Sequence, residues 1–165
     1  MKYAVDANAM NEIDRTTMEI IGIPSMVLME KAAMKLVETM IPKITERDRI
    51  LAVCGSGNNG GDGAAAARLL HEKGYNVDIL LVGDETKASE QMKAQLNIVR
   101  NLGMSVYNSV KVSEYNVIID SLFGVGLKRT IEGKYAQIIQ EINHSGGMVF
   151  SVDLPSGVDA SMEKF

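Results

Sequence analysis

The sequence predicts an α/β fold, in which a mostly parallel sheet is covered by helices on both faces and preceded by N-terminal helices. Two observations carry this prediction. Short, continuously apolar segments alternate with helical patterns along most of the chain, as in parallel sheets that are buried on both sides. A glycine-rich run, residues 55–63, joins one apolar segment to an alanine-rich helical segment, as at the phosphate-binding turns of such sheets.

Helical patterns open the chain at residues 7–20 and 25–41. In the second pattern, apolar residues recur at helical spacing, and Pro42 closes it. These residues are Met26, Met29, Ala33, Leu36, Val37 and Met40. Because this helix is apolar around much of its circumference, we expect it to be buried in the core or to form part of a subunit contact.

After residue 48, strand and helix patterns alternate. The expected strands are residues 49–54, 77–82, 104–107, 117–120 and 148–152, and the expected helices are residues 61–73, 87–102 and 134–144. Gly74, Gly103 and Gly146 follow the three helices as C-terminal stops. In such sheets, ligands bind outside the carboxyl ends of the strands, where the strand order reverses.

The glycine-rich run reads Gly-Ser-Gly-Asn-Asn-Gly-Gly-Asp-Gly. Glycines after a strand let the backbone approach a phosphate closely, and the amides and dipole of the following helix favour the anion. Asn58, Asn59 and Asp62 add oxygen ligands that a phosphate cradle alone does not require. The run therefore predicts a phosphate-binding site with an additional polar function.

Two further polar loops begin where expected strands end. They are residues 120–129, DSLFGVGLKR, and residues 153–159, DLPSGVD. Asx-turns or helix caps explain Asp120 or Asp153 taken singly. Because the carboxyl ends of parallel strands meet at one edge of a sheet, we expect both loops to share a crevice with the glycine-rich run.

Charge balance at this edge predicts a bound cation. Asp62, Asp120 and Asp153 crowd a site that also attracts phosphate, and like charges are unfavourable unless they are protonated or neutralised. Without a cluster of histidines or cysteines, a hard alkali or alkaline-earth ion fits better than zinc. Its plausible oxygen ligands are Asn59, Asp120 and Ser156. In the alternative, Lys128 and Arg129 carry part of the compensation by meeting phosphate directly.

The composition disfavours several function classes. With 165 residues, the chain fits a single domain. Its net charge of −4 argues against nucleic acid or an anionic membrane as the main partner. Cys54 is the only cysteine, which suits a reducing compartment, and we interpret it as a buried strand residue. The sequence shows no signal peptide and no apolar run long enough to cross a bilayer, so we expect a cytoplasmic protein.

Taken together, the three loops resemble the NAD(P)H-hydrate epimerase family, also known as the YjeF N-terminal domain. The resemblance rests on residues 55–63, on residues 120–127 (DSLFGVGL) and on residues 152–159 (VDLPSGVD), with a further match at residues 28–33 (LMEKAA). Their order and spacing agree over nearly the whole chain, and this combination of motifs is highly specific.

The resemblance implies a three-layer αβα, Rossmann-like fold over residues 1–165 and an isomerase that interconverts the R and S forms of hydrated NADH and NADPH (NADHX and NADPHX). That activity repairs damaged cofactor and feeds the S form to a partner dehydratase. Potassium would be bound by Asn59, Asp120 and Ser156, the set that charge balance also suggests. Family members commonly form homodimers through their N-terminal helices.

The resemblance also implies a set of substrate contacts in the three loops. They are Asn58, Asn59, Gly60, Gly61, Asp62, Gly124, Val125, Gly126, Leu127, Lys128, Arg129, Thr130 and Asp153. Two departures from the family pattern stand out. Family members usually carry a proline near Thr130, so the rigidity of this loop is in question. Family domains also continue past the third loop, so we expect a chain ending at Phe165 to lack the family's C-terminal strands.

The chemistry of the substrate suggests a role for Asp153. In the hydrated nicotinamide, the hydroxyl and the ring nitrogen share carbon 6, so a carboxylic acid can protonate the departing hydroxyl while the nitrogen lone pair assists. Water then attacks the opposite face; ring opening and reclosure is an equally allowed route. Asp153 stands at a strand end beside other carboxylates, which favours the raised pKa that such an acid requires.

Two alternatives remain at this stage. The segment GSGNNG matches the G-x-G-x-x-G fingerprint, and Asp84 follows the next strand where an acid would bind a ribose, as in an NAD(P)-dependent oxidoreductase. A non-catalytic nucleotide-binding or scaffold protein of the same fold is the second alternative. A P-loop kinase is disfavoured because no Lys-Ser or Lys-Thr follows the glycines.

Overall fold

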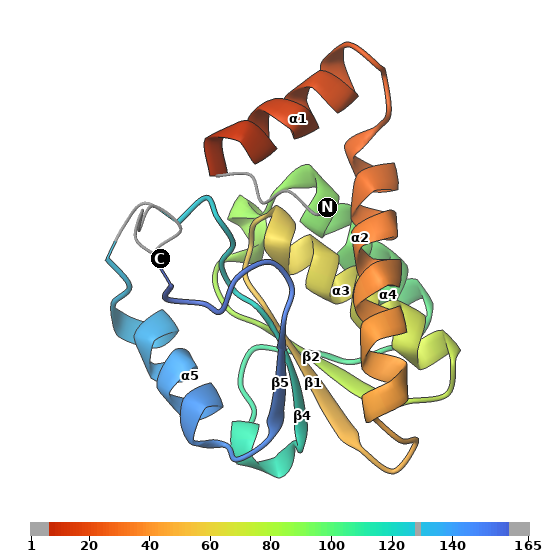
Figure 1. The fold of residues 1–165 in the computed structure, drawn as a ribbon. Coiled ribbons are helices and arrows are strands. Elements are labelled where there is room, and N and C mark those ends of the chain that lie inside the picture. The colour runs from red at the N-terminus through yellow and green to blue at the C-terminus, as the bar shows by residue number, and fades with distance from the viewer. Residues whose placement is uncertain (1–6, 128–129, 159–165) are drawn as a thin grey trace.

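The structure, a computed structural model, describes residues 7–127 and 130–158 and contains a five-stranded parallel sheet with helices on both faces (Figure 1). Its strands are β1 (Arg49–Cys54), β2 (Asn76–Leu81), β3 (Val106–Tyr107), β4 (Val117–Ser121) and β5 (Met148–Ser151). They lie in the order β3-β2-β1-β4-β5, and every neighbouring pair is parallel. The predicted fold class is confirmed.

Five α-helices and three short 3₁₀ helices are found in the described part of the chain. The α-helices are α1 (Ala7–Glu19), α2 (Ser25–Met40), α3 (Asn58–Glu72), α4 (Glu90–Asn101) and α5 (Gly133–His144); the 3₁₀ helices are η1 (Ile41–Lys43), η2 (Glu85–Lys87) and η3 (Val112–Glu114). Figure 1 shows α2, α3 and α4 on one face of the sheet and α5 on the other. The three layers follow from this arrangement.

The central strand β1 divides its side chains between two cores. Ile50, Ala52 and Cys54 face the layer of α2, α3 and α4, whereas Leu51 and Val53 face α5. All five are fully buried. Because both faces of the strand are covered, its sequence is continuously apolar instead of alternating with polar residues, which is the pattern that predicted a parallel sheet.

Helix α3 begins at Asn58, three residues earlier than predicted, so part of the glycine-rich run is helical. The reason is close packing. A Cβ atom on Gly60 would collide with the carbonyl oxygen of Gly55, and one on Gly61 would lie 2.6 Å from the terminal methyl of Met29. Residues 58–60 read as a loop in the sequence because glycine has low helix propensity, but tertiary packing requires glycine at position 60.

Helix α2 docks on α3 through the segment LMEKAA, residues 28–33. Met29 is buried against Gly61, and Glu30 accepts a hydrogen bond from Arg68 of α3. Arg68 also donates to Glu72 at 3.0 Å, so its guanidinium, whose side chain is 10% exposed, is balanced by two carboxylates. The expectation that α2 lies in the core is confirmed for the face that includes Met29, Ala33, Val37 and Met40.

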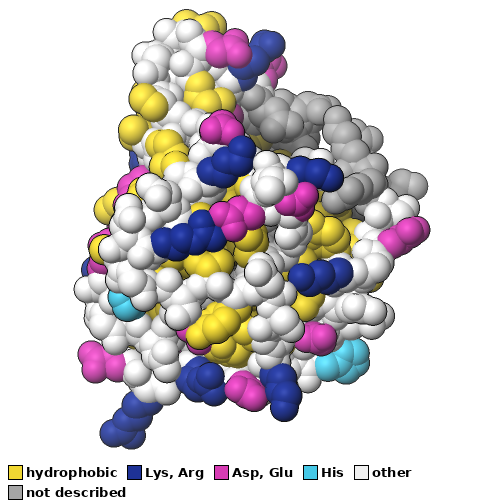
Figure 2. All heavy atoms as spheres, turned by 180° about the vertical axis from the view of Figure 1, so that it is seen from behind, with side chains coloured by type: hydrophobic (Ala, Val, Ile, Leu, Met, Phe, Trp, Pro, Cys, Tyr) yellow, Lys and Arg dark blue, Asp and Glu magenta, His cyan; other side chains and the backbone are white. Residues whose placement is uncertain are grey.

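Helix α1 projects from the body near the carboxyl ends of the strands (Figure 1). Hydrophobic side chains gather on this projecting end of the molecule, as Figure 2 shows from behind. The large apolar residues of α1, α2 and the turn between them that remain exposed are Met10, Ile13, Met18, Ile20, Ile21, Val27 and Met34. Within the described residues, no helix combines the length and apolar character needed to cross a membrane.

Candidate functional site

The strand order reverses between β1 and β4, and the loops that follow these two strands pack directly on each other. The backbone N–H of Gly55 donates to the carbonyl of Ser121 at 3.1 Å. A Cβ atom on Gly55 would collide with the carbonyl oxygen of Leu122. Glycine is therefore required where the two loops cross, and this crossing is the floor of the switch-point crevice.

Below this crossing lies Cys54, which the structure confirms as a buried strand residue. Burial raises the pKa of its thiol to about 12, so the thiolate is not available at neutral pH. The hydroxyl of Ser121 donates to the carbonyl of Val53 at 2.9 Å, and a Cβ atom on Gly63 would collide with that hydroxyl. This layer supports the site and does not take part in its chemistry.

A cavity of about 910 Å³ lies at the carboxyl ends of the strands. It is lined by Met10, Asp14, Ala32, Gly55, Ser56, Gly57, Asn58, Asn59, Asp62, Leu122, Phe123, Gly124, Val125, Gly126, Leu127, Tyr135, Val152 and Asp153. Among these described lining residues, three are aspartates and none is lysine or arginine. The described side chains of the cavity are therefore acidic, and the described groups that can meet an anion are backbone N–H groups and neutral donors.

Asp153 ties the loop after β5 to the loop after β4. Its Oδ2 accepts a hydrogen bond from the backbone N–H of Val125 at 2.8 Å. A Cβ atom on Gly124 would lie 2.5 Å from this oxygen and 3.3 Å from Oδ1 of Asn59. Asp153, Gly124 and Asn59 thus converge at one place, although they come from three different segments of the chain.

Asp120 lies one layer deeper, and both of its carboxylate oxygens are engaged. Oδ1 accepts from the Ser156 hydroxyl at 2.6 Å, and Oδ2 accepts from the Ser156 backbone N–H at 2.8 Å. The Ser156 hydroxyl oxygen in turn accepts from the N–H of Phe123 at 3.1 Å. Asp120 is only 4% exposed, so these bonds hold a buried carboxylate at the end of β4.

Asp62 lies in the second turn of α3, and the pKa of its carboxyl group is raised. Burial raises its pKa, and the negative charges of Asp153 and Asp14 raise it further, to about 7. Desolvation penalises the ionised form, and the two neighbouring carboxylates disfavour a third negative charge. The carboxyl of Asp62 therefore exchanges its proton near neutral pH, which is the property of a general acid or base.

The structure brings most of the predicted site residues to this cavity. Asn58, Asn59, Asp62, Gly124, Val125, Gly126, Leu127 and Asp153 line it. Gly60 and Gly61 are buried beneath it against Gly55 and Met29, and Thr130 is exposed and does not line it. Lys128, Arg129 and Asp159 lie outside the described residues.

Of the three aspartates that were expected to meet, two line the cavity and one is buried beneath it. Asp62 and Asp153 line the same cavity, whereas Asp120 lies beneath it and reaches the third loop through Ser156. Asp84, the ribose acid of the oxidoreductase alternative, does not line the cavity. Its side chain instead caps η2 by accepting from the N–H of Thr86 at 2.9 Å.

Three lining residues lie outside the motifs that the sequence singled out: Met10, Asp14 and Tyr135. Phe123 and Tyr135 form a tilted aromatic pair with ring centroids 5.2 Å apart, at the side of the cavity formed by α5. Phe123 lies inside a predicted loop, so it was within reach of the sequence. Met10 and Asp14 line the cavity only because of where α1 packs, and no local sequence pattern predicts that packing.

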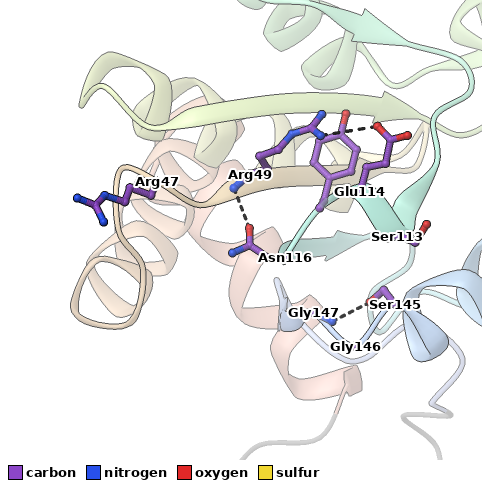
Figure 3. A pocket seen from close by; sticks show the side chains of 9 residues that line it. Arg47, Arg49, Ser113, Glu114, Asn116, Ser145, Gly146 and Gly147 are labelled. Atoms are coloured by element: carbon purple, nitrogen blue, oxygen red, sulfur yellow. Dashed lines mark hydrogen bonds and ion pairs between the residues drawn. The ribbon is translucent and has the colours of Figure 1, made fainter.

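A second hollow, of about 350 Å³, lies at the amino ends of the strands, near the start of β1 (Figure 3). Arg49 there pairs with Glu114 at 3.7 Å and lies over the ring of Tyr115, 4.9 Å from its centroid. Arg47 extends away from the other labelled side chains in Figure 3. Because the charge of Arg49 is already balanced and the hollow lies away from the carboxyl ends of the strands, we assign no site to it.

Comparisons with known proteins agree with this geometry. Residues 25–165 match the family described as YjeF-related protein N-terminus. A protein named NAD(P)H-hydrate epimerase in Weissella koreensis is 41% identical over 98% of this chain and 73% of its own length. One of the same name in Leuconostoc citreum is 39% identical over 95% of this chain and 71% of its own length.

A solved structure supports the same relationship. The crystal structure of yeast ynu0, YNL200c, superposes with a TM-score of 0.86 at 25% sequence identity, over 96% of this chain and 72% of that chain. The family match, the two relatives near 40% identity and this structural likeness cover the same sheet and the same three loops. The chain belongs to the family of YjeF-related N-terminal domains, whose relatives named here are NAD(P)H-hydrate epimerases.

Proposed function

We propose that this chain epimerises R- and S-NAD(P)H hydrate, and so takes part in the repair of nicotinamide cofactors. The observation that carries the proposal is the meeting of Asp62 and Asp153 in one cavity at the switch point of a parallel sheet. Dinucleotides bind at such switch points, and inversion at carbon 6 of the hydrated ring needs proton transfer, which carboxyl groups supply.

In the proposed reaction, a carboxylic acid protonates the hydroxyl on carbon 6, and the carbon–oxygen bond breaks as the ring nitrogen lone pair forms a C=N bond. Water then adds to the opposite face of the planar cation and loses a proton to a carboxylate. Asp153 takes part in these transfers, because it lines the cavity at the end of β5 and is held there by the Val125 N–H.

Backbone N–H groups are proposed to bind the pyrophosphate of the substrate. The described lining residues include no lysine or arginine, but they include the start of α3 and the glycine-containing segment 124–127. Backbone N–H groups at a helix start bind phosphate well, and the helix dipole adds to the attraction. Lys128 and Arg129 lie outside the described residues, and we propose from their place in the sequence that they also contact phosphate.

Potassium is proposed to bind beside this loop, at Asn59, Asp120 and Ser156. Two observations fit such an ion. Asp120 is a buried carboxylate for which no ion pair is found among the described residues, and the buried amide nitrogen of Asn59 has no hydrogen-bond partner there, so the amide group is not fixed by the protein alone. Alkali ions prefer oxygen ligands of this kind. When bound, the ion would offset the negative charge of the carboxylates near the substrate.

The proposal also covers partners and location. We propose that a dehydratase specific for the S form consumes the product, and that the enzyme works in the reducing cytoplasm, where its single thiol Cys54 stays reduced. We further propose a homodimer through α1 and α2, supported by exposed apolar residues such as Ile13, Ile20 and Met34. Sedimentation equilibrium of the wild type and of Met34→Glu tests this, because a dimer built on this face should dissociate in the variant.

The proposed function is tested with purified R-NADHX and an S-specific dehydratase in excess. The expected result is that this chain accelerates consumption of the R form above its spontaneous rate. An unchanged rate together with tight nucleotide binding would instead support the scaffold alternative. Consumption of a nicotinamide cofactor in the presence of an alcohol substrate, followed by its absorbance, would support the oxidoreductase alternative.

A further inference from the structure

Epimerisation at carbon 6 makes a demand on both faces of the hydrated ring. The hydroxyl leaves from one face with a proton, and water arrives at the other face and loses a proton. A single carboxyl group that serves both faces has to move around the ring between the two events. Two carboxyl groups from different parts of the structure avoid that movement, because each is already in place for one face.

The cavity contains such a pair. Asp62 comes from α3, the helix after β1, and Asp153 comes from the loop after β5. The charge of Asp153 is felt at Asp62, so the two groups lie within electrostatic reach of one another. They also differ in their surroundings: Asp153 accepts a hydrogen bond from the N–H of Val125 at 2.8 Å, whereas Asp62 is half-buried and its environment favours the protonated form.

We propose that Asp62 is a second catalytic carboxyl, which works with Asp153 so that each serves one face of the hydrated ring. This inference rests on the proposed epimerase function and assigns a particular chemical role within it. Asp62 is expected to donate its proton to the hydroxyl on one face, and Asp153 to accept a proton from water on the other. In the reverse direction the two groups exchange roles.

The proton balance of this scheme is closed. The O–H bond of Asp62 breaks as the leaving hydroxyl becomes water, and the electron pair of the C–O bond leaves with that oxygen. The ring nitrogen supplies the pair that forms C=N, and the pair returns to nitrogen when the incoming water bonds to carbon 6. The incoming water gives one proton to Asp153, so the carboxyl pair regains at the end of the turnover the proton that Asp62 gave up at its start, and no redox partner is needed.

The raised pKa of Asp62, about 7, supports this role. Asp62 faces two other carboxylates, Asp153 and Asp14 of α1, and no lysine or arginine stands among the described lining residues. Carboxyl groups whose charges interact titrate as a coupled pair. Activity should therefore require the singly protonated pair and decline as pH rises through about 7, in both reaction directions.

The test measures kcat and KM for R-NADHX against pH in the wild type and in Asp62→Asn, with the fold of each variant checked by circular dichroism. Asp62→Asn should lose about 10²–10⁴-fold in kcat with a much smaller change in KM, and Asp62→Glu should recover part of the loss. Carboxyl ¹³C NMR of the wild type should show Asp62 titrating near pH 7, because burial and the charges of Asp153 and Asp14 raise its pKa.

Two variants of α1, Asp14→Asn and Glu12→Gln, test whether the charge of Asp14 raises the pKa of Asp62 or whether any change in this helix alters the pH dependence. Asp14→Asn should move the upper pH limb to lower pH, because it removes one of the charges that raise the pKa of Asp62. Glu12→Gln removes a charge from the same helix but does not line the cavity, and its pH limb should stay in place. An Asp62→Asn variant that keeps its kcat within about threefold, or a pH limb that Asp14→Asn does not move, would overturn the inference. An inactive wild type would instead defeat the epimerase proposal itself.

Discussion

Oδ2 of Asp153 accepts a hydrogen bond from the backbone N–H of Val125 at 2.8 Å, and this contact joins the loop after β5 to the loop after β4. The contact is available because residue 124 is glycine: a Cβ atom there would lie 2.5 Å from the same oxygen. The position of the Asp153 carboxylate, the proposed catalytic group, therefore depends on the absence of a side chain in the opposite loop.

We predict that Gly124→Ala displaces Asp153 and lowers kcat by about 10²-fold, since a misplacement of about 1 Å in a catalytic group costs about that much. The carboxylate, and not the backbone, should yield, because it is the end of a flexible side chain. Steady-state kinetics with R-NADHX measures the effect. Gly126→Ala is the matched variant of the same loop, and its Cβ would meet no atom within 4 Å. Its kcat should exceed that of Gly124→Ala by about tenfold or more; equal losses would contradict the prediction.

We predict that potassium raises the melting temperature of the wild type and that Ser156→Ala reduces this increment. Ser156 Oγ is one of the proposed ligands and is bonded to Asp120. An ion at about 100 times its Kd stabilises a protein by about 2.7 kcal/mol, which is about 5–10 °C for a chain of this size. Differential scanning fluorimetry in KCl, against tetramethylammonium chloride at equal ionic strength, measures the increment.

The control for potassium binding is Ser113→Ala. Ser113 lies in η3, at the amino ends of the strands and away from the proposed ion site. It should keep the full potassium increment even if its baseline melting temperature changes. Equal increments in Ser156→Ala and in the wild type would exclude Ser156 as a ligand. No increment in the wild type would exclude a potassium site that is coupled to folding.

We predict that the raised pKa of Asp62 makes the protein lose stability as pH rises from about 4 to about 7. Its pKa is about 7 in the folded state against 3.8 as the ordinary value, so the folded chain binds more protons than the unfolded chain between these two values. The free energy of unfolding therefore falls as pH rises from about 4 to about 7 and is level above that range. Relative to Asp62→Asn, the wild type should lose roughly 2 kcal/mol between pH 5 and pH 8, after allowance for partial exposure.

Urea denaturation of the wild type and of Asp62→Asn at the two pH values measures this difference. Taking the difference between the variants cancels the other groups that titrate in the same range. A difference that does not change between pH 5 and pH 8 would show that Asp62 has an ordinary pKa. The same residue would then be an unsuitable proton donor at neutral pH, so this measurement bears on the chemistry as well as on stability.

The strands were predictable because burial on both faces leaves a signal in the sequence itself. The observed bounds of β1 equal the predicted ones, and β2, β4 and β5 end within one residue of expectation. β3 was predicted two residues too long, and η3 was not predicted at all, because short segments carry few periodic residues. The start of α3 was missed because glycine has low helix propensity, while the packing that requires it is tertiary.

The site was predictable where it depends on the ends of strands, and not where it depends on the placement of helices. The loops of Asn59, Gly124 and Asp153 follow parallel strands, whose ends meet by topology. Asp14 reaches the cavity because of how α1 lies over that edge, which no periodic pattern encodes. The raised pKa of Asp62 was not predicted, because it depends on burial of the carboxyl, which no sequence motif shows directly.

The last prediction separates the two chemical routes to inversion. If the carbon–oxygen bond breaks, the hydroxyl oxygen of the product comes from water; if the ring opens and recloses, that oxygen stays on carbon 6. We expect the first route, because Asp62 and Asp153 lie in one cavity and together can protonate a leaving hydroxyl and deprotonate an incoming water. Single-turnover epimerisation in H₂¹⁸O, analysed by mass spectrometry before spontaneous exchange becomes significant, should give one ¹⁸O atom per inversion. Inversion without ¹⁸O would favour ring opening, in which the ring nitrogen is the group that needs a proton.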